Sequence, residues 1–214
     1  MNINEFAVEV HKNAKAHGWW DEDRPLAEVI ALIHSEWSEA LEEYRANRPM
    51  VWYDSRSKGD DCGGGGRCGA DIFECVCKGH PHHGGCPGGH KPEGIAVELI
   101  DGCIRILDYL GKTETKIHEI VTLRKLMREV PKELLECDLP TLVARLHWYS
   151  SRAYVWGSTP FSERLVQEQM SFLYEALAMA CAWIKMSGLD PEAIMREKHE
   201  YNKTRPYKHG NKKC

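Results

Sequence analysis

The 214-residue chain lacks the long apolar run of a membrane-spanning helix, since no stretch approaches about 18 consecutive apolar residues. Its first 20 residues mix apolar with charged residues and contain neither the apolar core nor the cleavage site of a signal peptide. An excess of positive charge is also missing: the formal net charge of −4 disfavours a large nucleic-acid-binding face. We therefore expect a cytoplasmic protein with neither a membrane nor a nucleic acid as partner.

Strand-type alternation is almost absent, whereas helical periodicity recurs along most of the chain. Helices are expected over residues 3–17, 23–44, 93–110, 114–128, 139–155, 159–186 and 190–201, joined mostly by short loops. With 43% hydrophobic residues the chain can bury a sizeable core. These features predict one all-α domain, residues 1–214, built as a helical bundle of about seven helices.

Residues 58–91 interrupt this pattern with an inserted loop rich in glycine, cysteine and histidine, which has too few apolar residues to form its own core. A Cys-x-x-Cys pair is missing, which excludes a standard zinc ribbon. A structural Zn²⁺ is favoured because ligation would order a segment that burial cannot order. An inert surface loop and a redox sensor are the alternatives. Four ligands would suffice, and nine candidates are present: Cys62, Cys68, Cys75, Cys77, His80, His82, His83, Cys86 and His90.

A faint internal repeat places residues 114–188 as a degenerate copy of the first long helix pair. Setting His34 against His147 gives an offset of 113, and setting Glu98 against Glu175 gives an offset of 77. The two offsets differ by about the length of the insertion. The copy has lost most of the acids, since Tyr149 replaces Glu36, Arg152 replaces Glu39 and Ala178 replaces Asp101. Chance similarity between amphipathic helices is an equally good explanation.

Four carboxylates form the clearest chemical pattern. Glu36 and Glu39 lie one turn apart on one helix, and Glu98 and Asp101 lie one turn apart on another that is otherwise almost wholly apolar. Acids on a buried helix need a cation or strong hydrogen bonds. Pairing with Arg105 alone is one way to satisfy them. The four acids together predict a Mg²⁺ or Mn²⁺ site, because hard cations prefer carboxylate oxygens.

Lysines and arginines gather in one place, the C-terminal tail from Lys198 to Lys213. Arginine and lysine side chains can neutralise the oxygens of a polyphosphate. Most basic tails are simply solvated, but the tyrosines and proline of this segment favour docking on the rest of the protein. The segment is therefore a candidate phosphate clamp beside the acids.

The acid pairs and their neighbourhoods resemble those of the MazG-like branch of the all-α nucleoside triphosphate pyrophosphohydrolases, a superfamily related to the dimeric dUTPases. The resembling motifs are Glu36-x-x-Glu39, Glu98-x-x-Asp101, the Gly-Trp-Trp-Asp of residues 18–21, the Lys-Pro-Glu-Gly of residues 91–94 and the Tyr-Asn-Lys-Thr-Arg-Pro-Tyr of residues 201–207. The resemblance covers residues 1–48, 91–111 and 190–213. The 58 residues between the acid pairs exceed the usual family separation, which the insertion explains.

The resemblance implies Mg²⁺-dependent hydrolysis of (deoxy)nucleoside triphosphates at the α–β phosphoanhydride, giving a nucleoside monophosphate and pyrophosphate. Glu36, Glu39, Glu98 and Asp101 would hold the metal and act in catalysis. It also implies a homodimer or a higher homo-oligomer. The alternative is a catalytically inactive, zinc-containing helical module that binds or regulates a partner. The residues expected to bind substrate are Trp20, Arg105, Asp108, Asn202, Lys203, Arg205, Tyr207 and Lys208.

Overall fold

The computed structural model describes residues 1–54, 91–113, 121–157 and 163–208 of the chain. Its helices are α1 (Ile3–Ala16), α2 (Leu26–Arg45), α3 (Ile95–Lys112), α4 (Leu123–Glu129), α5 (Lys132–Leu135), α6 (Leu139–Gly157), α7 (Glu163–Met186) and α8 (Pro191–Lys203). Two short strands, β1 (Trp52–Asp54) and β2 (Lys91–Glu93), pair antiparallel. The prediction of a mostly helical protein is confirmed. Within these ranges, no helix combines the length and apolar character needed to cross a membrane.

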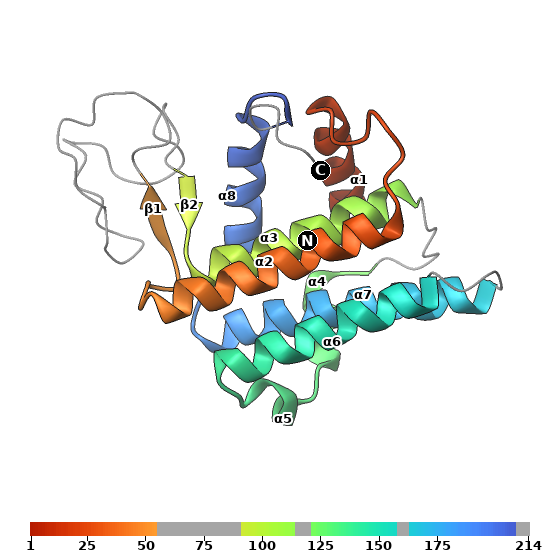
Figure 1. Ribbon diagram of the computed structural model, residues 1–214. Helices are drawn as coiled ribbons and strands as arrows, with labels where there is room; N and C mark the ends of the chain where they lie inside the picture. The colour runs from red at the N-terminus through yellow and green to blue at the C-terminus, as the bar shows by residue number, and fades with distance from the viewer. Residues whose placement is uncertain (55–90, 114–120, 158–162, 209–214) are drawn as a thin grey trace, which may run out of the picture.

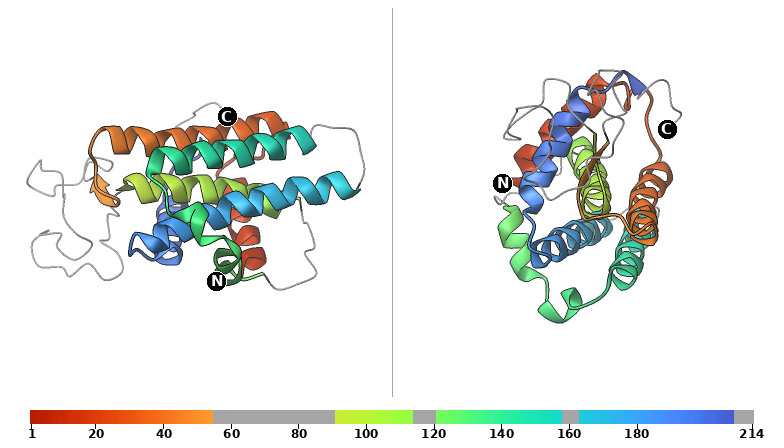
Figure 2. Two further views of the ribbon diagram at one scale, coloured as in Figure 1. Left: turned by 90° about the horizontal axis from the view of Figure 1, so that it is seen from below. Right: turned by 90° about the vertical axis from the view of Figure 1, so that its left-hand side faces the viewer.

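Helices α2, α3, α6 and α7 form a four-helix bundle at the centre of the fold (Figure 2). α2 runs antiparallel to α3 and α6 runs antiparallel to α7, and the two pairs meet through contacts of α2 with α6 and of α3 with α7 (Figure 1). Trp37 is fully buried at this junction and donates its indole N–H to Ser150 Oγ at 3.0 Å. A Cβ added at Gly102 would lie 2.3 Å from the Trp37 ring, so the absence of a side chain there lets α3 approach α2 closely.

The remaining helices cover opposite sides of the bundle. α1 and α8 lie against α3, whereas α4 and α5 lie against α7 (Figure 1). α8 begins as the sequence predicts, with the Asp190 side chain accepting a hydrogen bond from the backbone N–H of Glu192 and with Pro191 in the first turn. One cavity lies where α1 and α8 pack on the bundle, and a different one lies where α4 and α5 pack on it.

Strands β1 and β2 hold the two ends of the insertion together, because Asp54 pairs with Lys91 and Trp52 pairs with Glu93. Gly94 follows with φ of +110°, a conformation that residues with a side chain rarely adopt. Helix α3 then starts at once, which places Glu98 in its first turn. The two strands were not predicted, since three residues are too few to show an alternating pattern.

The expected helix over residues 114–128 is wrong in its extent. Thr122 has an extended backbone (φ −98°, ψ 144°), forms a bridge with Asn2 and caps the short α4 by accepting a hydrogen bond from the backbone N–H of Lys125. Val121 and Thr122 are β-branched, which favours an extended backbone over a helical one. Residues 114–120 lie outside the described residues.

Candidate functional site

A polar cavity of about 340 Å³ opens between α1, α2, α3 and α8. Its lining combines the predicted acids with several cations contributed by other parts of the chain. The charged residues of this lining are Glu36, Glu39, Glu98, Asp101, Asp108, Arg24, Lys91, Arg105 and Arg205, with His17 and His199 beside them. The cavity therefore brings together segments that lie far apart in the sequence.

Three carboxylates converge at the centre of this cavity. Glu36 of α2 and Glu98 and Asp101 of α3 each direct one oxygen so that the three oxygens lie within 4.8 Å of one another. Glu36 is 6% exposed and Glu98 is 5% exposed. Glu39 lines the same cavity outside this trio, where it accepts a hydrogen bond from Ser35 Oγ at 2.9 Å. The structure thus brings together all four predicted acids, three of them in direct reach of one ion.

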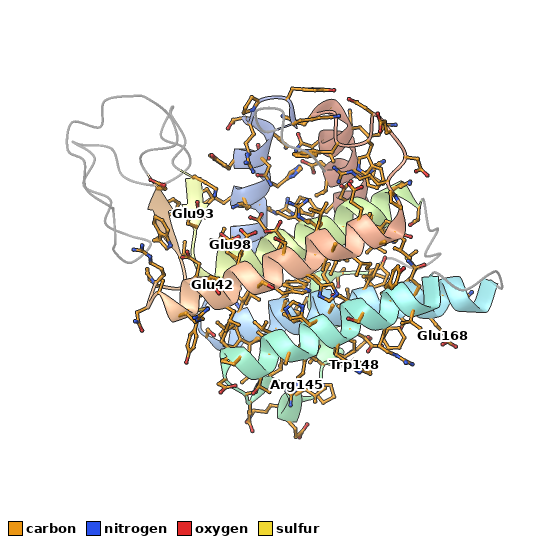
Figure 3. All side chains as sticks on the ribbon, viewed as in Figure 1. Glu42, Glu93, Glu98, Arg145, Trp148 and Glu168 are labelled. Carbon is orange, nitrogen blue, oxygen red and sulfur yellow. The ribbon has the colours of Figure 1, made fainter. Side chains whose placement is uncertain are left out.

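Burial changes the acidity of two members of the trio, Glu36 and Glu98. Burial, together with the negative charge of Asp101, raises the pKa of Glu98 to about 9, against the opposing charge of Lys198. Burial also raises the pKa of Glu36, against the opposing effect of the Arg105 guanidinium. Figure 3 shows Glu98 and Glu93 beside the base of α8, and a hydrogen bond in which protonated Glu98 donates to Glu93 adds to the raised pKa of Glu98. A divalent cation close to these three acids would offset the raised pKa values of Glu36 and Glu98.

Two cationic side chains already contact the trio. Arg105 Nε lies 2.5 Å from Glu36 Oε1. Lys198 Nζ lies 2.8 Å from Asp101 Oδ2 and donates a hydrogen bond to the carbonyl oxygen of Pro92 at 3.1 Å. Lys198 is 1% exposed, so its charge is balanced almost entirely by the acids. These two cations offset part of the negative charge of the trio.

The C-terminal segment is only partly placed as predicted. Asn202 and Arg205 line the cavity. The amide oxygen of Asn202 is buried and has no hydrogen-bond partner among the described residues, which makes it a contact point for a bound ligand.

The other predicted members of the clamp are bound elsewhere. Lys203 is paired with Glu9 at 2.8 Å and Glu200 at 2.6 Å, because it leaves α8 on the side that faces α1. Tyr207 donates its hydroxyl to Asp21, and Lys208 Nζ lies 3.6 Å from the same carboxylate. The structure therefore does not bring Lys203, Tyr207 or Lys208 to the acids.

The two adjacent tryptophans before α2, Trp19 and Trp20, contact different groups. Trp20 Nε1 donates to both carboxylate oxygens of Asp108, at 2.8 Å and 3.0 Å, and His11 Nδ1 lies 2.8 Å from the same group. Trp20 and Asp108 are therefore engaged with each other, although Asp108 also borders the cavity. The tryptophan that lines the cavity is Trp19, and the Arg24 guanidinium lies 5.2 Å from the centroid of its ring.

Sequence reasoning placed Lys198 only in the basic C-terminal segment, without predicting its contact with the acids, and it missed Lys91 as a site residue. A usable signal existed for Lys198, because the buried positions Pro191, Ile194, Met195 and Lys198 follow a helical period along α8. A lysine in an apolar stripe indicates a buried partner of opposite charge. Lys91 gave no comparable signal, since its place at the cavity follows from the unpredicted pairing of β1 with β2.

The candidate zinc ligands Cys62, Cys68, Cys75, Cys77, His80, His82, His83, Cys86 and His90 lie outside the described residues. Cys103 and Cys181 are buried in the bundle, as expected for core residues, with their sulfur atoms 3.9 Å apart.

Comparisons with family models, with curated proteins and with solved structures returned no match to this chain. A functional assignment therefore depends on the geometry of the cavity and on the motifs of the sequence.

Proposed function

We propose that the protein is a MazG-like hydrolase that cleaves (deoxy)nucleoside triphosphates at the α–β phosphoanhydride, giving a nucleoside monophosphate and pyrophosphate. The observation that supports this most directly is the convergence of Glu36, Glu98 and Asp101 within 4.8 Å. They lie in a cavity that also presents Arg205 and Asn202. Acids for a metal and basic groups for phosphates are the two parts that such a reaction needs.

The donor set fits Mg²⁺ or Mn²⁺. All donors of the trio are carboxylate oxygens, which hard divalent cations prefer, whereas Zn²⁺ sites are built mainly from cysteine and histidine. The trio leaves room for phosphate oxygens because it supplies only part of a six-coordinate shell. When bound, the cation would polarise the phosphoryl oxygens and hold the triphosphate in place.

Side chains of the protein would accept the proton and bind the substrate. Glu39 lies outside the trio and is the carboxylate best placed to accept the proton of the attacking water. Arg205 offsets negative charge on the departing pyrophosphate, and its planar guanidinium suits two phosphate oxygens at once. Asn202 directs its unpartnered amide oxygen toward a hydrogen-bond donor of the substrate. Trp19 offers an aromatic face to the base.

The test is pyrophosphate release from a panel of ribo- and deoxyribonucleoside triphosphates with MgCl₂, with the nucleoside monophosphate identified by chromatography. Glu36→Gln and Asp101→Asn each remove a charge from the trio and should lower kcat by at least about a hundredfold. The matched control is Glu42→Gln, on the same helix as Glu36 but paired with the exposed Arg45. It should keep wild-type activity.

Two results would overturn the proposal. The first is equal activity in the wild type, Glu36→Gln and Asp101→Asn, which would separate the acids from the reaction. The second is release of inorganic phosphate in place of pyrophosphate, which would move cleavage to the β–γ bond.

A further inference from the structure

A second cavity, of about 600 Å³, lies between α4, α5, α6 and α7. Helices α5, α6 and α7 lie on the side of the fold away from α1 and α8 (Figure 1). Its volume is within the range of about 300–1,000 Å³ that small-molecule sites occupy. Apolar side chains and two tyrosines make up most of the lining. They are Val121, Leu126, Val130, Pro131, Leu134, Ala178, Met179, Tyr149 and Tyr174.

The position of this cavity follows from how the two helix pairs face each other. His34 of α2 stacks on His147 of α6, with the two Nδ1 atoms 2.5 Å apart and the rings nearly parallel. Trp37 of α2 bonds to Ser150 of α6. Both pairs are separated by 113 residues, the offset that aligns the two halves of the chain. Residues at equivalent positions of the two halves of the chain therefore contact each other where α2 packs on α6. The faces of α6 and α7 that point away from α2 and α3 are then equivalent to the faces of α2 and α3 that point away from α6 and α7.

The second cavity is the counterpart of the first by residue as well as by place. The positions aligned with the acid trio all line it: Tyr149 for Glu36, Glu175 for Glu98 and Ala178 for Asp101. One carboxylate of three remains, which is too few to hold a hard divalent cation. The change of residues converts a polar cavity into a mostly apolar one.

The charge of the second cavity is also opposite to that of a phosphate site. Its charged lining residues are Glu129 and Glu175, and among the described residues that line it there is no lysine or arginine. Glu175 accepts a hydrogen bond from Ser171 Oγ at 3.1 Å. Arg145, labelled in Figure 3, lies beside the cavity and donates a hydrogen bond to the carbonyl oxygen of Leu134. Two carboxylates at an apolar cavity disfavour a phosphate and favour a cation.

We propose that this cavity is a second small-molecule site, which binds an aromatic amine that carries no phosphate. The aromatic ring packs against Tyr149 and Tyr174, and the ammonium group pairs with Glu175, with Glu129 adding to the negative field. Cation–π attraction from the tyrosines supports the same ligand class. This binding does not depend on nucleotide hydrolysis at the first cavity, because Tyr149, Tyr174, Glu129 and Glu175 line the second cavity and not the first.

Isothermal titration calorimetry of the full-length protein in EDTA tests this proposal with two probes that contain the same indole ring. Tryptamine carries an ammonium group and indole-3-acetate carries a carboxylate. Tryptamine should bind with a Kd below about 1 mM. Indole-3-acetate should bind at least about tenfold more weakly, because it meets Glu175 and Glu129 with like charge.

Three variants locate the binding. Glu175→Gln should weaken tryptamine binding about tenfold by removing the pairing carboxylate. Ala178→Phe fills the cavity and Ser171→Trp obstructs it from an exposed position, so each should abolish binding, and the second serves if the first does not fold. Glu42→Gln should bind tryptamine as the wild type does. Absence of tryptamine binding, equal affinity for indole-3-acetate, or wild-type affinity in the folded cavity variants would each overturn the proposal.

Discussion

Replacing Glu98 by glutamine should stabilise the metal-free protein at mildly alkaline pH. In the folded protein, burial and the charge of Asp101 raise the pKa of Glu98 to about 9. In the unfolded chain the same carboxyl titrates near its ordinary value of about 4.3. Between these two values the folded protein holds a proton that the unfolded chain has released. The free energy of unfolding therefore falls as the pH rises through this window.

The size of the effect follows from one proton. A difference of one bound proton changes the free energy of unfolding by about 1.4 kcal/mol per pH unit, so the loss between pH 7 and 8.5 is up to about 2 kcal/mol. This range lies outside the titrations of the buried histidines and of Cys103. Burial lowers the pKa of His34, His147 and His199, which therefore act below about 6.5, where stability falls as the pH falls. Burial raises the pKa of Cys103 well above 9, which places its effect above this range.

Urea unfolding in EDTA at the two ends of that range measures the difference. The wild type and the Glu42→Gln control should lose stability toward the higher pH. Glu98→Gln should lose less than half as much stability. The remaining dependence on pH is due to Glu36, whose pKa burial also raises. Wild-type stability that stays constant or rises over this range would refute the reasoning, and so would an unchanged slope in Glu98→Gln.

Three further substitutions test the contacts of the site and of the bundle. Lys198→Met should lower the free energy of unfolding in EDTA by about 3 kcal/mol, because it leaves the partly buried Asp101 and the buried Glu98 without this cation. Urea unfolding should show MgCl₂ restoring more stability in the variant than in the wild type, and equal stabilisation would contradict the assignment. Arg205→Gln should lower kcat/KM for a nucleoside triphosphate by at least about tenfold through loss of a charged contact of about 1.5–3 kcal/mol, whereas Lys203→Gln should change it by less than about threefold; steady-state kinetics that rank the two in reverse order would restore Lys203 to the clamp. Gly102→Ala should destabilise the bundle by about 1–3 kcal/mol through overpacking against Trp37, and an unchanged melting temperature would contradict the close approach of α2 and α3.

The acids were predictable from sequence because their positions follow helical geometry. Glu98 and Asp101 lie on a helix whose other faces are apolar, and burial of such a helix forces its acids into a shared environment. Glu36 and Glu39 lie three apart on a second amphipathic helix, which fixes their common side. Bringing the two pairs together required only that the helices pack antiparallel.

The basic residues were less predictable, because the direction of each side chain depends on the backbone after α8. Helix α8 ends at Lys203 with Thr204 as its cap. Residues beyond this point no longer follow a helical period, and Arg205 faces the acids while Lys203 faces α1. For the same reason two adjacent tryptophans in an irregular segment, Trp19 and Trp20, turned to different neighbours.

The pairing of Asp54 with Lys91 makes the intervening segment an exchangeable cassette. Both of its ends are held by one ladder, at the spacing that a two-residue hairpin turn normally bridges. An Asn-Gly turn in its place would preserve the entry into α3, and nature or an engineer could vary the cassette without rebuilding the bundle. Because Lys91 also borders the cavity, any change that displaces this end of β2 would also displace a positive charge of the cavity.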